Sequence, residues 1–146
     1  MRTALLGLLV VIGFCSGCAT SQVRLEASKA TLHNNLKYSE KEKVLCIWNK
    51  VDMYATWPIT IPKTGKYKVS MTYACPNSES GSEIEIAVGD QRLKTKTNGT
   101  NGFYSYITED KGILTLSAGA CELKVSPISK PNTWVMDLRE VVLTEE

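Results

Sequence analysis

The residue types that most enzymes use for catalysis are scarce in this sequence. His33 is the only histidine, and no serine or cysteine lies in a nucleophile-elbow sequence. A Ser-His-Asp, Cys-His or histidine-metal hydrolase would need this one imidazole, and an isolated histidine is more often structural. Carboxylates are plentiful, but Glu83 and Glu85 share the solvent face of one predicted strand, which is no glycosidase pair. The sequence therefore predicts a protein that is not an enzyme.

Aromatic residues indicate a different chemistry, because some of them lie beside predicted loops. Trp48, Phe103 and Trp134 are in such positions, whereas Tyr67 and Tyr73 fall on the inward face of a predicted strand. Sugars present apolar C–H faces ringed by hydroxyls. Binding sites for sugars therefore combine one or two flat rings with Asn, Asp or Lys side chains that make hydrogen bonds.

The N-terminus has the pattern of an export signal. Arg2 is followed by an apolar run over residues 4–14 and then by small residues up to Cys18. The run is well short of the roughly 20 residues that span a bilayer. Residues 16–18 resemble a bacterial lipobox, which implies cleavage after residue 17 and a lipid anchor of the palmitate type on Cys18. The alternative is an ordinary signal peptide cut nearby.

The same resemblance indicates a location. Ala19 follows the cysteine, where an Asp would favour retention at the inner membrane. By similarity to Gram-negative sorting rules, we expect a lipid-anchored protein of the outer membrane, facing either the periplasm or the surface. Two or three acyl chains, at about 0.8 kcal/mol per buried methylene, would hold it there without any spanning segment.

Removal of residues 1–17 leaves the length of a single domain. We expect a short polar tether over residues 18–24 and a folded domain over residues 25–146. Without Arg2, 16 basic residues stand against 15 acidic ones, a balance that indicates no nucleic-acid partner.

Three cysteines remain in the expected domain, Cys46, Cys75 and Cys121, and they allow at most one internal disulfide. The spacing does not choose a pair. Cys75 and Cys121 continue the inward parity of predicted strands, so both are expected to be small buried hydrophobic residues.

Most of the remaining sequence is typical of short strands separated by turns. Alternating apolar and polar residues predict strands over residues 55–61, 66–75, 83–88, 91–97, 114–116, 121–125 and 134–143. Pro58 suggests that the first of these lies at a sheet edge, and residues 38–43 read as a charged loop. No stretch over 12 residues shows helical periodicity. We expect an all-β fold, a single antiparallel β-sandwich or jelly roll whose terminal strands pair with each other.

Several segments in order resemble galactose-binding-like β-sandwich modules, namely residues 48–57, 65–69, 73–76, 81–83, 118–119 and 134–139. The most similar modules are those appended to bacterial fucosidases and sulfatases, and carbohydrate-binding modules of families 6 and 35 are more distantly similar. The resemblance covers residues 25–143. It implies the same sandwich fold and a non-catalytic carbohydrate-binding role, because such modules bind sugars at loops at one end of the sandwich.

The resemblance also implies which residues form the ligand cleft. Phe103 stands where a stacking tryptophan often stands, and Trp48 precedes a strand that the same cleft uses. Asn132 and Trp134 lie beside the position of a ligand-binding Asn, although strict alignment puts Val135 at that position. These four residues, Trp48, Phe103, Asn132 and Trp134, are the predicted ligand-binding residues.

The related modules hold a structural calcium ion between a Glu-x-Glu in the first strand and an Asp in the last. This sequence offers Glu26 and Asp137, but Ser28 replaces the second Glu. Glu26 and Asp137 are therefore candidate calcium ligands. The expected partner is a polysaccharide or oligosaccharide, and the alternative is a protein of the cell envelope.

Overall fold

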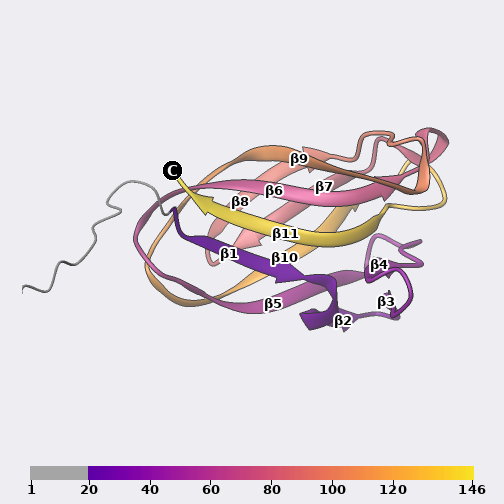
Figure 1. Ribbon diagram of the computed structural model, residues 1–146. Coiled ribbons are helices and arrows are strands. Elements are labelled where there is room, and N and C mark those ends of the chain that lie inside the picture. Colours follow the sequence, from indigo (N-terminus) through magenta and orange to yellow (C-terminus); the bar gives the residue numbers. More distant parts are fainter. Residues whose placement is uncertain (1–19) are drawn as a thin grey trace, which may run out of the picture.

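The computed structural model describes residues 20–146, which form two stacked antiparallel β-sheets (Figure 1). The strands are β1 Gln22–Glu26, β2 Thr31–His33, β3 Lys37–Ser39, β4 Val44–Cys46, β5 Tyr54–Ile61, β6 Gly65–Cys75, β7 Glu83–Val88, β8 Gln91–Lys96, β9 Gly102–Leu116, β10 Gly119–Ser129 and β11 Asp137–Glu145. Two 3-10 turns, η1 Ala27–Lys29 and η2 Asn77–Glu79, complete the described elements. One sheet has the order β3-β4-β11-β6-β9, with β1 also paired to β11, and the other has the order β2-β5-β10-β7-β8. The predicted antiparallel β-sandwich is confirmed.

The core forms between the two sheets because side chains alternate in direction along each strand. In β6 the predicted inward residues are all buried, namely Tyr67, Val69, Met71, Tyr73 and Cys75. In β7 the same holds for Ile84, Ile86 and Val88. Each large apolar side chain removed from water in this way contributes about 1.5–3 kcal/mol.

Several strand boundaries differ from the prediction, and β10, for example, covers Gly119–Ser129 and not only 121–125. β9 begins at Gly102 and not near residue 114, so a long strand was missed. It is the outermost strand of its sheet and pairs only with β6, so many of its side chains face solvent and the alternation is weak. β11 begins at Asp137 and not at residue 134. The preceding segment makes a different contact, in which the Val135 N–H donates to the Trp48 carbonyl at 2.8 Å.

Two smaller expectations are also modified. Residues 38–39, expected within the loop over 38–43, belong to the short strand β3, which pairs with β4. β5 lies between β2 and β10, so it is not an edge strand along its whole length. β2 pairs only with residues 54–56 of β5, and Pro58 lies beyond them. A proline is tolerated there because β2 offers no carbonyl for a backbone N–H at this position.

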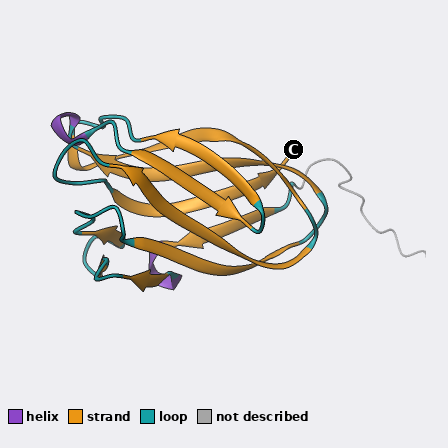
Figure 2. Cartoon of the chain, turned by 180° about the vertical axis from the view of Figure 1, so that it is seen from behind, coloured by secondary structure: helices purple, strands orange, loops and turns teal. Residues whose placement is uncertain are grey.

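The two ends of the described chain lie together at one end of the sandwich (Figure 1). β1 pairs with β11 along its length, with Gln22 opposite Thr144, as expected for paired terminal strands. Residues 22–24, expected within the tether, therefore belong to strand β1. The proposed signal segment and Cys18 lie outside the described residues. The loops that precede β9 and β11 lie at the opposite end, as Figure 2 shows from behind.

All three cysteines of the described chain are free thiols. Cys75 is buried as predicted, whereas Cys121 is only partly buried. From residue 20 onward the chain forms no helix long and apolar enough to cross a membrane.

Lys111 joins the two sheets where β9 passes β8. It is the extra residue of a bulge in β9, because Gly112 pairs with Val69 and Asp110 with Ser70. Its Nζ atom donates to the Lys96 carbonyl on β8 at 2.8 Å and lies 2.7 Å from Glu109. The side chain is only 4% exposed, so this bridge is largely removed from water.

Candidate functional site

Two aromatic rings meet at the loop end of the sandwich. Phe103 is the second residue of β9, and Trp134 lies in the loop before β11. Their ring centroids are 6.4 Å apart and their planes cross at 85°, an edge-to-face contact. Together they line a pocket of about 240 Å³ whose remaining wall is formed by Cys46, Ile47, Tyr104 and Asp137. We call this the aromatic pocket, and it brings together two of the four predicted ligand-binding residues.

The loop that leads into Phe103 is fixed by Asn77. Its side chain accepts the Asn101 N–H at 3.1 Å and donates to the Asn101 Oδ1 at 2.8 Å. Gly99 packs directly against it, and a Cβ atom added to Gly99 would come within 2.8 Å of the Asn77 Cα. The Thr100 N–H donates to the Cys75 carbonyl at 2.7 Å. These contacts hold the backbone that leads into β9 and so position the start of the strand that carries Phe103.

The loop that carries Trp134 is fixed from both sides. The Trp134 N–H donates to the Glu79 carboxylate at 2.9 Å, and the next N–H, of Val135, donates to Trp48. Asn132 is exposed, and its amide donates to the Ser80 carbonyl at 3.1 Å. Asn132 therefore supports the loop and is not among the residues that line the aromatic pocket.

Trp48 does not have the accessible ring that the sequence predicted. Its side chain is 0% exposed, and its Nε1 donates to the Met53 carbonyl at 2.8 Å. The reason is the backbone of Ile47, whose φ of 55° is uncommon for a β-branched residue. This turn leaves Ile47 50% exposed at the rim of the pocket and directs Trp48 into the core. The prediction that Trp48 stacks on a ligand is therefore wrong.

Asp137, the first residue of β11, supplies the charge of the aromatic pocket. Burial, with a smaller effect of the nearby Glu42 carboxylate, raises the pKa of Asp137 from 3.8 to about 6. Burial and then the Asp137 charge also raise the pKa of the Cys46 thiol above its usual value. At neutral pH the pocket thus contains an ionised carboxylate and a protonated thiol, between aromatic surfaces.

The structure does not bring the two candidate calcium ligands together. Glu26 pairs in register with Glu140 and lines a different pocket. Asp137 lies three residues earlier along β11, about 10 Å away along the strand. Within residues 20–146 no three His, Cys, Asp or Glu side chains are grouped so that they could hold a metal ion. The residues present do not fit the calcium site of the related modules.

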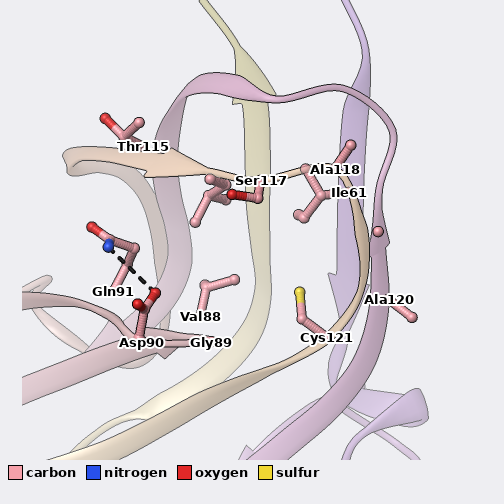
Figure 3. Close-up of a pocket in the computed structure, with 12 residues that line it drawn as sticks. Ile61, Val88, Gly89, Asp90, Gln91, Thr115, Ser117, Ala118, Ala120 and Cys121 are labelled. Atoms are coloured by element: carbon pink, nitrogen blue, oxygen red, sulfur yellow. Dashed lines mark hydrogen bonds between the residues drawn. The ribbon is translucent and has the colours of Figure 1, made fainter.

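Two other pockets lack a comparable set of rings. One lies at the end of the sandwich that holds the chain termini, and Figure 3 shows small residues such as Ala118 and Ala120 around it, with Cys121 on its wall. In this pocket Gln91 donates to Asp90 at 3.4 Å. The other pocket contains one ring, that of Tyr38, among charged side chains. Neither offers a pair of rings for stacking.

His33 lies in the other sheet, away from the aromatic pocket. Its ring stacks on Tyr54 at a centroid distance of 4.1 Å, and its Nε2 lies 3.0 Å from the Thr56 hydroxyl. The sequence missed three pocket residues. Cys46 ends β4 and Ile47 follows it, with no loop signal in the sequence there, and Tyr104 lies in the part of β9 that alternation did not reveal.

Solved structures with the same fold cover most of this chain. A family 35 carbohydrate-binding module from Clostridium thermocellum matches with a TM-score of 0.72 and 16% identity, over 86% of this chain and 99% of that module. The C-terminal family 6 module of LamC, a marine laminarinase from Zobellia galactanivorans, matches with a TM-score of 0.71 and 16% identity, over 86% and 100%. A β-(1,4)-mannanase with a family 35 module from Podospora anserina matches with a TM-score of 0.60 and 15% identity, over 86% of this chain and 28% of that enzyme.

No protein-family model and no curated protein sequence matches the chain. At this low identity the structural matches establish the fold alone. The chains of both solved modules are covered almost completely, so the similarity is to a whole domain. The chain therefore has the antiparallel β-sandwich fold of family 35 and family 6 carbohydrate-binding modules.

Proposed function

We propose that this domain is a non-catalytic carbohydrate-binding module whose ligand site is the aromatic pocket. The observation that carries the proposal is the edge-to-face pair of Phe103 and Trp134 in an open pocket beside the Asp137 carboxylate. The rings offer an apolar surface to the C–H face of a sugar, and the carboxylate oxygens accept hydrogen bonds from its hydroxyls. The solved structures support this, because two that match over almost their whole length are carbohydrate-binding modules.

The site is rigid enough for such a role. Trp134 is held by its backbone bond to Glu79, and Phe103 follows the loop fixed by Asn77. A ring that is already in place loses little conformational entropy when a ligand stacks on it. Truncation of a central aromatic residue in a binding site removes on the order of 1–3 kcal/mol, or about 5- to 150-fold in affinity.

The test is binding of residues 20–146, which contain every strand of both sheets, to a panel of polysaccharides. We expect Phe103→Ala and Trp134→Ala each to lose about fivefold or more in affinity for any polysaccharide that the wild type binds. Tyr54→Ala is the matched control, because this ring lies in the other sheet and stacks on His33. Cooperative unfolding of each variant shows that it is folded. Equal binding by wild type and both pocket variants would refute the assignment of the site.

A protein ligand from the cell envelope is the second candidate. The exposed Tyr104, at 77%, and Ile47, at 50%, form an apolar rim that a protein surface would cover. This candidate gains if no polysaccharide binds and one envelope protein is retained by the wild type but not by Tyr104→Ala.

We further propose that Cys18 is lipidated and holds the domain on the outer membrane. The lipobox-like residues 16–18 support this, as does the start of β1 at the opposite end of the sandwich from the aromatic pocket. β11 runs from the pocket to the chain termini over about 26 Å, so a tethered domain presents the pocket away from the lipid surface. Cys18→Ala is expected to lose palmitate labelling and to leave the membrane fraction. Unchanged labelling would refute the anchor.

A further inference from the structure

The carboxylate of Asp137 has no partner in the part of the chain that the structure describes. No donor of residues 20–146 makes a hydrogen bond to it, although Asp137 is partly buried. Arg139, two residues along β11, is directed to the Tyr106 ring, with its guanidinium carbon 3.7 Å from the ring centroid. The six ion pairs of the described chain do not include Asp137.

The surroundings of this carboxylate are negative. Glu42 acts on Asp137 as a like charge, and the Glu79 carboxylate lies behind Trp134, where it accepts the backbone N–H. Asp137 is the one charged residue among the six that line the aromatic pocket. A shielded carboxylate without a counterion is unfavourable, so a ligand that brings a positive charge gains more here than a neutral one.

The rings of the pocket favour the same kind of ligand. Three of the six lining residues, Phe103, Tyr104 and Trp134, are aromatic, and the faces of aromatic rings attract cations. A hydroxyl group can donate to Asp137, but it leaves the negative charge uncompensated. An ammonium group donates up to three hydrogen bonds, and a charge-assisted bond to a carboxylate is about twice as strong as a neutral one.

We infer that the aromatic pocket selects an amino sugar and binds its protonated amino group against Asp137, with the sugar ring stacked on Phe103 or Trp134. This inference rests on the proposed function and names the class of carbohydrate. It also predicts what is rejected. An N-acetylated sugar has lost the charge, and the carboxylate of a uronic acid would meet the like charges of Asp137 and Glu42.

The experiment compares a glucosamine tetramer with its fully N-acetylated counterpart by calorimetry at near-neutral pH. We expect the amine form to bind about tenfold or more tightly. In Asp137→Asn, which keeps the side-chain shape and removes the charge, the ratio of the two affinities is expected to fall to about one. Asp52→Asn is the matched control, because Asp52 is exposed and lies outside the pocket, and its ratio should equal that of the wild type.

The possible outcomes distinguish failure of the amino-sugar inference from failure of the proposed function. Equal or tighter binding of the N-acetylated tetramer, or a preference that survives in Asp137→Asn, overturns the inference. If other polysaccharides still bind and lose affinity in Phe103→Ala and Trp134→Ala, the proposed function stands without the amino-sugar inference. Absence of binding by every glycan, the glucosamine tetramer included, overturns both. A pentalysine peptide that binds more tightly than the tetramer, with the same dependence on Asp137, would show that the ammonium comes from a protein and not from a sugar.

Discussion

Replacement of Asp137 by Asn is expected to stabilise the fold at neutral pH. Burial, then the Glu42 charge, raises the pKa of Asp137 to about 6 in the folded protein, whereas the ordinary pKa of an aspartate is 3.8. Between these two pH values the folded chain holds a proton that the unfolded chain has released. Stability therefore falls as the pH rises through this window, and the full cost of the charge is present above about pH 6.

The expected change in the free energy of unfolding follows from the raised pKa of Asp137. Each pKa unit corresponds to about 1.4 kcal/mol, so a shift of about two units gives an upper limit of about 3 kcal/mol. The aromatic pocket is open to solvent, since Tyr104 at its rim is 77% exposed, and water screens part of this energy. We expect Asp137→Asn to raise the free energy of unfolding by about 1–2 kcal/mol at pH 7.

The assay is equilibrium unfolding in guanidinium chloride, followed by tryptophan fluorescence at pH 7 and pH 4. The gain from Asp137→Asn should shrink towards zero at the lower pH, where the wild-type carboxyl group is protonated in the folded state. Asp52→Asn, at an exposed position, should change stability by less than about 0.5 kcal/mol. A loss of stability in Asp137→Asn at pH 7 would refute the reasoning and show that the carboxylate has a favourable partner, such as a bound cation. A gain in stability that is the same at pH 7 and pH 4 would show that the charge of Asp137 is not the cause.

Two further substitutions test how the site and the sandwich are held. Gly99→Ala places a Cβ atom 2.8 Å from the Asn77 Cα, so we expect it to lower the free energy of unfolding by about 1–3 kcal/mol in chemical denaturation. The control Gly65→Ala, with no atom within 4 Å of the new Cβ, should be neutral or slightly stabilising. Equal effects of the two substitutions would contradict the close packing of the loop at Gly99. Lys111→Ala removes the bridge between β9 and β8 and leaves the Lys96 carbonyl without this donor, whereas Glu109 keeps its hydrogen bonds from Tyr73 and Asn98. We expect a loss of about 1–3 kcal/mol in the free energy of unfolding in the same assay, against less than about 0.5 kcal/mol for the exposed Lys94→Ala. A loss as small as that of the control would show that the bridge contributes little.

The sequence predicts the strands that alternate and misses those that do not. β6 and β7 have one face in the core and one in solvent, so period-two patterns give both their position and their inward residues. β9 belongs to the sheet edge, where exposed apolar residues such as Ile113 carry no pattern. The segment 134–136 is apolar like a strand, but its backbone bonds go to Glu79 and Trp48, which no local pattern encodes.

The site is predicted less completely than the fold, for a physical reason. Phe103 and Trp134 were expected near one cleft, and the structure brings their rings into contact. Trp48 was expected there as well, and one uncommon backbone torsion at Ile47 sends it into the core. Such a torsion is set by tertiary contacts, so neighbouring residue types cannot reveal it. Asp137 was assigned to calcium, and its place beside the rings emerges only from the packing of β11 against β4.

Stability and binding make opposite demands on Asp137, and this opposition allows one variant to test the central argument twice. Replacing an Asp that served only the fold by Asn would not raise stability, because the charge of that Asp would already have a partner. A residue that serves a ligand leaves its charge unpaired until the ligand arrives, so its removal stabilises the empty domain and weakens binding. If Asp137→Asn gains stability above pH 6 and loses its preference for the amine, the unpaired carboxylate acts in recognition. A gain in stability without any change in binding would show that the unpaired carboxylate does not act in recognition of the ligand.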